Sequence, residues 1–172
     1  MAVQRTKDTY QKQIYDFIKD ILVVCPGCNK NAIVRTAKQP PIINIQEKEI
    51  KVVCTHCGFN KRLEEKPASV LFSSSSNKKP QENFIIIGTA IDPYFHLQLW
   101  LTINCCDNIL WAYNYEHLEF IKQHVEAKLR ERNTAEMKNN SLGSRLPKWM
   151  SSTKNRDTVL KAIIQLQQKQ IK

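Results

Sequence analysis

The chain has 172 residues, of which 42% are hydrophobic and 24% charged, and its formal net charge is +10 at pH 7. That length suits one domain or two small ones, and the apolar share is ordinary for a folded protein. The longest apolar runs fall well short of the about 20 residues that a membrane-spanning helix needs, which argues against a transmembrane protein. The first 20 residues mix acidic with basic side chains and lack the apolar core of a signal peptide, so we expect a cytoplasmic protein.

The first predicted element is an amphipathic helix over residues 8–23. Tyr10, Ile14, Phe17 and Ile21 recur at intervals of three and four, which is the spacing of one helix face. Asp8 lies in the expected first turn, where a negative charge suits the helix dipole.

Residues 23–66 are predicted to form strands joined by turns. The stretches AIVRTA, IINIQ, EIKVVC and FNKRLEE are strand-like, and Pro40 and Pro41 mark a bend between two of them. Each end of this region carries a Cys-x-x-Cys motif, CPGC at residues 25–28 and CTHC at residues 54–57.

The two motifs predict a single metal site. A Cys-x-x-Cys turn directs two sulfurs to one ion, and two such turns give the tetrahedral set of four sulfurs that structural Zn²⁺ sites use. We expect Cys25, Cys28, Cys54 and Cys57 to hold one structural zinc ion, whose coordination they would fill. Iron also binds four thiolates, and one motif alone could be a redox dithiol. His56 is expected to point outward as a polar contact.

The stretch from Val23 to Glu65 resembles a zinc ribbon, a fold of basal transcription factors and many nucleic-acid enzymes. The resemblance rests on CPGC, CTHCG and the strands between them. It departs where a glycine commonly follows the first pair, because Asn29 stands there; asparagine also tolerates the left-handed conformation. The motifs DPYFHLQLWL, LWAYN and RLPKWM are similar to those of uncharacterised bacterial proteins that carry a zinc ribbon. That similarity implies no activity.

The segment after the second motif is predicted to be a linker. Residues 67–82 contain four consecutive serines, two prolines and no periodic apolar pattern. We therefore predict two units, an N-terminal helix with a zinc ribbon at 1–66 and a second unit at 83–172.

The second unit is predicted to contain a β-hairpin and helices. FIIIGTAI is strand-like, HLQLWLTI and ILWAYN flank the short turn CCDN, and residues 115–133 have helical periodicity with Asn114 as the expected N-cap. A last helix is expected to begin near Ser152. The whole chain is thus predicted to be an α+β protein.

No catalytic group stands out in the second unit. Cys105 and Cys106 are read as buried or turn thiols, although one could join His96 or His117 in a second metal site, or pair with His96 as a nucleophile. The chain has only 4 glycines and no phosphate-binding loop. We expect no enzyme.

The positive charge gathers towards the two ends of the chain. Residues 138–172 carry eight basic side chains against one acid, Asp157. Positive surfaces attract phosphate backbones, although they also serve solubility. The predicted nucleic-acid contacts are Lys30, Arg35, Lys51, Lys61, Arg62, Arg145, Lys148, Lys154 and Arg156.

These observations favour a non-enzymatic zinc protein that binds DNA or RNA. Association with transcription is one function that such a protein could have. The alternative is a protein-interaction module, such as an adaptor or an immunity-type protein, whose basic surface steers an acidic partner. Neither hypothesis requires a membrane or a small-molecule substrate.

Overall fold

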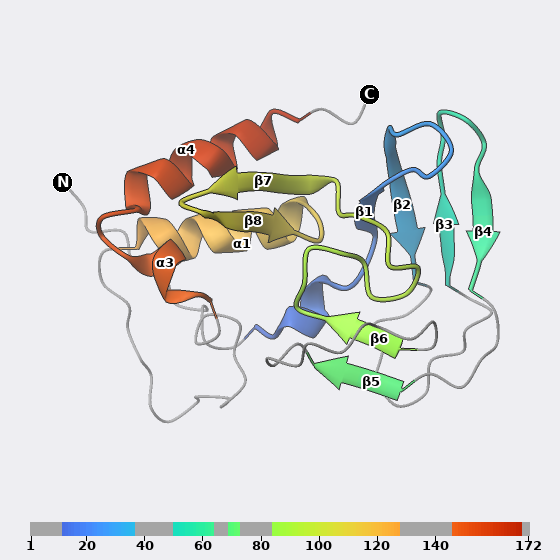
Figure 1. The fold of residues 1–172 in the computed structure, drawn as a ribbon, viewed down its shortest axis with the longest axis horizontal. Coiled ribbons are helices and arrows are strands. Elements are labelled where there is room, and N and C mark those ends of the chain that lie inside the picture. The colour runs from blue at the N-terminus through green and yellow to red at the C-terminus, as the bar shows by residue number, and fades with distance from the viewer. Residues whose placement is uncertain (1–11, 37–49, 64–68, 73–83, 128–145, 170–172) are drawn as a thin grey trace.

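A computed structural model of the chain describes residues 12–36, 50–63, 69–72, 84–127 and 146–169. The strands are β1 (Ile21–Val24), β2 (Asn31–Arg35), β3 (Lys51–Val53), β4 (Asn60–Arg62), β5 (Ser69–Phe72), β6 (Phe84–Ile87), β7 (Leu101–Cys105) and β8 (Asn108–Ala112). The helices are the 3-10 turn η1 (Ile14–Phe17), α1 (Tyr115–Glu126), α3 (Lys148–Ser151) and α4 (Arg156–Gln167). Antiparallel strands and helices in separate parts of the chain confirm the α+β class (Figure 1).

The segment predicted as an N-terminal helix contains one short helical turn and then becomes a strand. η1 ends at Phe17 and β1 begins at Ile21, so a helix through residue 23 is wrong. Residues 8–11 lie outside the described part. Three of the four residues in ILVV are β-branched, which favours an extended chain. Asp20 has φ of 51°, a left-handed conformation that breaks the helical path just before the strand.

The four-stranded antiparallel sheet β1-β2-β3-β4, here called the ribbon sheet, is joined to the second half of the chain through β1. One edge of β1 pairs with β2. On its other edge Leu22 N–H donates to Tyr113 C=O at 2.8 Å, and Trp100 N–H donates to Leu22 C=O at 2.9 Å. Val24 N–H likewise donates to Gln98 C=O at 2.8 Å. β1 is therefore hydrogen-bonded to both predicted units. Their limits at residues 66 and 83 stay a prediction.

The side chains of β1 alternate between two hydrophobic clusters. Ile21 and Val23 join the cluster that also contains Val34, Val52 and the turns of the ribbon sheet. Leu22 joins the second cluster, formed by the β7–β8 hairpin and the helices. Because successive side chains of a strand point to opposite faces, one strand supplies both cores.

Part of the predicted linker is ordered. Residues 69–72 form β5, which pairs in parallel with β6. The apolar sequence Val70, Leu71 and Phe72 suits a strand, and the serine run that follows lies outside the described residues.

The predicted hairpin is confirmed. β7 and β8 pair from Leu101 opposite Ala112 to Cys105 opposite Asn108. α4 packs on β7, α1 packs on β8, and the two helices contact each other (Figure 1). This arrangement buries the apolar stripes of both helices.

Asn114 caps α1 as its sequence position predicts. Its Oδ1 accepts the His117 N–H at 2.9 Å. Its Nδ2 donates to the carbonyls of Phe17 and Lys19, at 3.1 and 2.8 Å. One side chain thus fixes the start of α1 and ties η1 to it.

The prediction that the last helix begins near Ser152 is wrong. Ser152 closes the short helix α3, and α4 begins at Arg156 after Asn155. The Asn155 side chain donates to Trp149 C=O at 3.0 Å, which holds the connection between the two helices.

Asp92 organises the turn that leads to the hairpin. The side chain is completely buried, and its two oxygens accept the N–H groups of Tyr94, Phe95 and Leu97 at 3.0, 2.9 and 2.6 Å. We expect Asp92→Ala to lower the free energy of unfolding by about 2–4 kcal/mol, because it leaves backbone donors without an acceptor. Urea unfolding measures this, with the exposed Asp157→Ala as the control. An equal loss of unfolding free energy in both variants would contradict the role of these three hydrogen bonds to Asp92.

Candidate metal centre

The first cysteine turn connects β1 to β2. Cys25 N–H donates to Lys30 C=O at 2.7 Å, and Asn29 N–H donates back to Cys25 C=O at 2.9 Å. Asn29 has φ of 57°, so asparagine does take the left-handed position where a glycine commonly stands. Gly27 N–H points at the Cys25 sulfur, 3.4 Å away. The turn brings Cys28 beside Cys25.

The second turn repeats the first between β3 and β4. Cys54 N–H donates to Phe59 C=O at 2.8 Å, and Gly58 N–H donates to Cys54 C=O at 3.1 Å. Gly58 has φ of 75° at the position that matches Asn29. The antiparallel pairing of β2 with β3 places the two turns at the same end of the ribbon sheet (Figure 1).

The four sulfurs form one compact cluster. The Cys25 and Cys57 sulfurs lie 3.6 Å apart, those of Cys28 and Cys54 3.7 Å apart, and all four within 4.8 Å of one another. Sulfurs bonded to one tetrahedral Zn²⁺ at about 2.3 Å would be about 3.8 Å apart. A disulfide needs about 2.05 Å, and all four cysteines are free. The cluster is therefore positioned to hold one metal ion.

The electrostatics of the cluster also fit a cation. Burial raises the pKa of Cys54, but hydrogen bonds from the His56 and Cys57 backbone and from the neighbouring thiols lower it by more, to about 7. The Phe59 backbone lowers the pKa of Cys57, but desolvation and the three other cysteines raise it by more, to about 12. The pKa values of the two thiols move in opposite directions because four thiolates at such distances repel one another, so one thiol ionises more easily and another keeps its proton. A divalent cation removes that repulsion.

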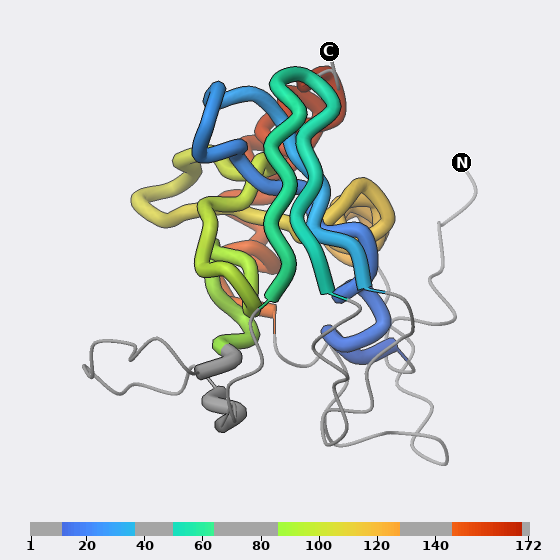
Figure 2. The backbone as a smooth tube through the Cα atoms, turned by 90° about the vertical axis from the view of Figure 1, so that its right-hand side faces the viewer, coloured from blue at the N-terminus to red at the C-terminus, as the bar shows by residue number. Residues whose placement is uncertain are grey.

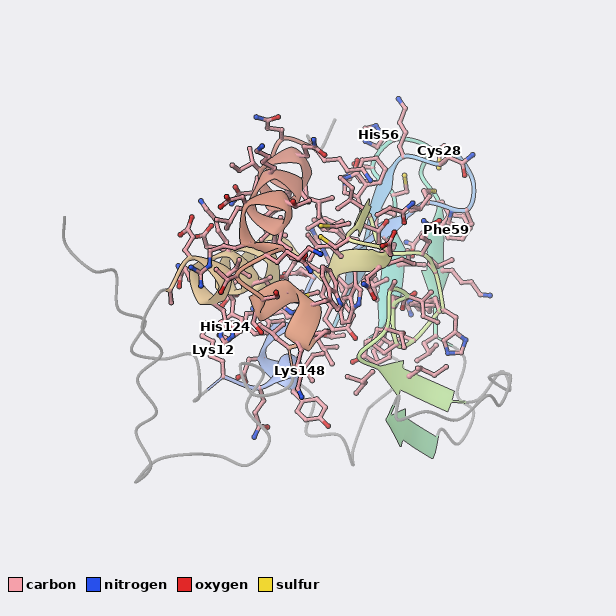
Figure 3. The ribbon with its side chains drawn as sticks, turned by 60° about the vertical axis from the view of Figure 1, so that its left-hand side comes forward. Lys12, Cys28, His56, Phe59, His124 and Lys148 are labelled. Carbon is pink, nitrogen blue, oxygen red and sulfur yellow. The ribbon has the colours of Figure 1, made fainter. Side chains whose placement is uncertain are left out.

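Asn31 supports the cluster from the start of β2. Its side chain is buried, and its Oδ1 accepts a hydrogen bond from His56 Nε2 at 3.0 Å. Its backbone carbonyl lies 3.6 Å from the Cys54 sulfur. His56 is exposed and belongs to a polar contact, as expected, and the sulfur cluster does not include it (Figure 3).

The alternatives for a second site find no support among the described residues. There, the four cysteines are the only group of three or more His, Cys, Asp or Glu side chains close enough to share an ion. His117 instead lies within the core, and its Nδ1 accepts the Tyr113 N–H at 3.2 Å. Cys105 and Cys106 lie beside each other at the hairpin turn.

Three of the basic residues predicted on the ribbon sheet form a row across it. Arg35 pairs with Lys51 in the β2–β3 register, and Lys51 pairs with Arg62 in the β3–β4 register. Residues directly opposite one another share a face of the sheet, and neighbouring strands are about 4.8 Å apart. These three residues, here called the cationic row, are the last residue of β2, the first of β3 and the last of β4, so they lie at the end of the ribbon sheet away from the cysteine turns.

The other two predicted ribbon contacts lie elsewhere. Lys61 is opposite Val52, so it belongs to the other face of β4. Lys30 lies in the first cysteine turn, at the opposite end of the strands. Sequence reasoning named all five residues but could not separate them, because their grouping depends on strand register.

Three predicted contacts of the C-terminal segment, Lys148, Lys154 and Arg156, belong to another part of the fold than the cationic row. Lys148 is in α3, and Lys154 and Arg156 surround the start of α4, whereas Arg145 lies outside the described residues. Figures 1 and 2 place α3 and the start of α4 at the end of the molecule opposite β3 and β4. The structure therefore contains two separate basic regions.

Lys169 is engaged inside the fold. Its Nζ donates to Trp100 C=O at 2.6 Å and lies 4.3 Å from the centre of the Trp100 ring. Its backbone carbonyl accepts the Tyr115 hydroxyl at 2.5 Å. Part of the positive charge counted in the C-terminal segment thus stabilises the end of α4.

Comparisons of the chain with protein-family models, curated proteins and solved structures gave no match. The resemblance to a zinc ribbon therefore rests on the four cysteines and their turns, and the link to bacterial zinc-ribbon proteins stays a prediction. No helix in the described ranges is long and apolar enough to cross a membrane.

The glycines of the two cysteine turns are expected to tolerate alanine differently. Gly58→Ala is expected to lower the free energy of unfolding by about 1 kcal/mol, because φ of 75° is unfavourable for a residue with a β-carbon. At Gly27 an added β-carbon would meet the Cys57 sulfur at 3.5 Å, an ordinary contact, so Gly27→Ala is expected to be nearly neutral. Thermal unfolding of both metal-loaded variants compares them, and equal losses would contradict the assignment.

Proposed function

We propose that the protein binds nucleic acid through the cationic row, on a ribbon sheet held together by one structural zinc ion. The zinc assignment is supported by four sulfurs within 4.8 Å of one another, two pairs of them close to the tetrahedral separation, and by the repulsion that a dication would remove. Four protein sulfurs leave no coordination position for a substrate, so the proposed role of the metal is structural.

The observation that carries the proposal is the register of the cationic row. Like charges directly opposite each other in a sheet are destabilising. Arg35 and Arg62 are exposed and Lys51 is half-buried between them. Neither ion pair found among the described residues involves the row. An arrangement that costs stability in the free protein is explained if a polyanion neutralises it.

The spacing of the row suits a phosphate backbone. Three strands about 4.8 Å apart place the outer two cations about 10 Å apart at their backbones, and the long side chains can adjust. Contacts of this kind position a nucleic acid without reading its sequence. The proposal therefore expects weak sequence preference for DNA or RNA.

Binding to short labelled DNA and RNA across a salt series tests the proposal. If the three cations contact phosphates, replacing all of them by glutamine should reduce the salt slope on duplex DNA by about 2.7, at about 0.9 per contact. Lys51→Gln should weaken binding more than Lys61→Gln, a matched control on the neighbouring strand that lies on the other face.

Two outcomes would count against the cationic row. An unchanged slope in the triple variant, together with a loss in Lys154→Glu/Arg156→Glu, would move the interface to the start of α4. No binding at low salt would remove the nucleic-acid hypothesis and favour an acidic protein partner, which a nuclease-resistant pull-down would identify.

A further inference from the structure

A second pair of thiols lies at the tip of the β7–β8 hairpin. Cys105 ends β7, Cys106 is the first residue of the turn, and their sulfurs are 3.6 Å apart. Both are free, and neither belongs to the four-cysteine cluster. The proposed zinc centre and the cationic row leave this pair without a role.

The turn holds Cys106 in an uncommon backbone conformation. Cys106 and Asp107 have φ of 52° and 57°, and they connect the paired residues Cys105 and Asn108. Positive φ at both central residues defines a type I′ turn, which favours asparagine, aspartate and glycine. Asp107 fits that preference and Cys106 does not. Backbone strain of this kind is concentrated at functional sites.

The two thiols differ in their surroundings. Cys105 is 6% exposed and packs in the cluster between the hairpin and the helices, whereas Cys106 is half-buried at its margin. Burial and the neighbouring Cys106 raise the pKa of Cys105 to about 11. A reagent can therefore reach Cys106 first and then meet a protonated thiol beside it.

The number and spacing of the sulfurs limit what the pair can hold. A disulfide needs about 2.05 Å between them, much less than the 3.6 Å found. Two sulfurs bonded at about 2.3 Å to one pyramidal centre, at an angle of about 100°, are about 3.5 Å apart. No third His, Cys, Asp or Glu completes a cluster here among the described residues. The pair therefore suits a centre that takes only two protein sulfurs, unlike structural zinc, which takes four.

We propose that Cys105 and Cys106 form a two-sulfur site for one soft, thiophilic centre of the trivalent-arsenic class. An organic arsenic(III) oxide forms one As–S bond to Cys106 and one to Cys105, and the arsenic–oxygen bond breaks. The two thiol protons leave with that oxygen as one water molecule. Arsenic stays trivalent, so the reaction needs no oxidant or reductant.

Native mass spectrometry of the purified full chain with one equivalent of phenylarsine oxide tests the proposal. We expect one phenylarsenic adduct per chain with the loss of one water, and an unchanged content of bound metal. An excess of glutathione, a monothiol, should leave the adduct in place, and the dithiol 2,3-dimercaptopropanol should remove it.

Two variants locate the site. Cys106→Asn should abolish the adduct while it raises the melting temperature, because asparagine is favoured at this turn position. Cys105→Ser should also abolish the dithiol-reversible adduct. The stabilised Cys106→Asn variant keeps the test valid even if Cys105→Ser folds poorly.

Three results would overturn the proposal. One is the absence of an adduct on the wild-type chain. Another is an adduct that persists in Cys106→Asn. The third is an adduct that forms only as metal is released, which would assign the arsenical to the four-cysteine cluster. A chain purified without metal would reject the proposed zinc centre separately, and the loss of the adduct in Cys106→Asn would still decide the dithiol site.

Discussion

Cys54→Ser is expected to abolish metal binding and to unfold the ribbon sheet. β3 and β4 are three residues each, and every residue of β4 is exposed, so these strands bury too little apolar surface to hold themselves together. Structural Zn²⁺ sites contribute apparent binding free energies of about 10–16 kcal/mol in small zinc domains. The free energy of unfolding of a typical domain is only about 5–15 kcal/mol. Loss of the metal can therefore remove all or most of the stability.

The loss is expected to spread beyond the ribbon sheet. β1 supplies side chains to both hydrophobic clusters. The backbone of Leu22 is also hydrogen-bonded to Trp100 and Tyr113, on the edge of β1 away from β2. The melting temperature should therefore fall for the whole chain, and a zinc chelator should reproduce the effect in the wild-type protein. Metal analysis with circular dichroism measures both.

Cys106→Ser is the matched control for the Cys54 variant. It removes one cysteine outside the cluster and should leave the metal content unchanged. If the purified wild-type protein holds neither zinc nor iron, or if Cys54→Ser has the same stability as Cys106→Ser, the metal centre is refuted.

The second large effect concerns His117 and acid. Its ring is 2% exposed, stacks on Phe17 at 4.9 Å between centroids, and lies 5.6 Å from the rings of Trp111 and Tyr113. Its Nδ1 accepts the Tyr113 N–H, so the ring proton is on Nε2, which has no hydrogen-bond partner among the residues that the structure describes. Burial lowers the pKa of His117 to about 3.

The sign of the pH dependence follows from that pKa. In the unfolded chain a histidine takes up a proton near pH 6.5, whereas folded His117 stays neutral down to about pH 3. The contribution of neutral His117 to stability is therefore complete above pH 6.5 and is lost as the pH falls towards 3. The expected slope is about 1.4 kcal/mol per pH unit.

Urea unfolding between pH 7 and pH 4 measures this slope. His117→Leu should be less stable than the wild type at pH 7 and should lose less stability on acidification. Protonation of the zinc thiolates also lowers stability in acid, but it acts on both proteins, so the difference in slope isolates His117. His56→Gln, which alters an exposed ring, should keep the wild-type slope. Parallel curves for wild type and His117→Leu would reject the assignment.

Local sequence determined much of the candidate site. The spacing of Cys25, Cys28, Cys54 and Cys57 was sufficient to predict the cluster, because each Cys-x-x-Cys turn closes within a few residues through its own backbone hydrogen bonds. The left-handed Asn29, the hairpin and the Asn114 cap were predictable for the same reason. These features depend on the conformations of neighbouring residues.

Tertiary structure decided the features that join distant parts of the chain. The run at 21–24 fits a helix by its periodicity, and it becomes a strand because β2 offers partners on one edge and residues 98–100 on the other. The cationic row exists only through the register of three strands, since a shift of one residue would send Lys51 to the opposite face. The sequence by itself determined the turns and the ligands, whose geometry is local. Only the paired sheet decided which charges stand together, because strand register depends on contacts between residues far apart in the chain.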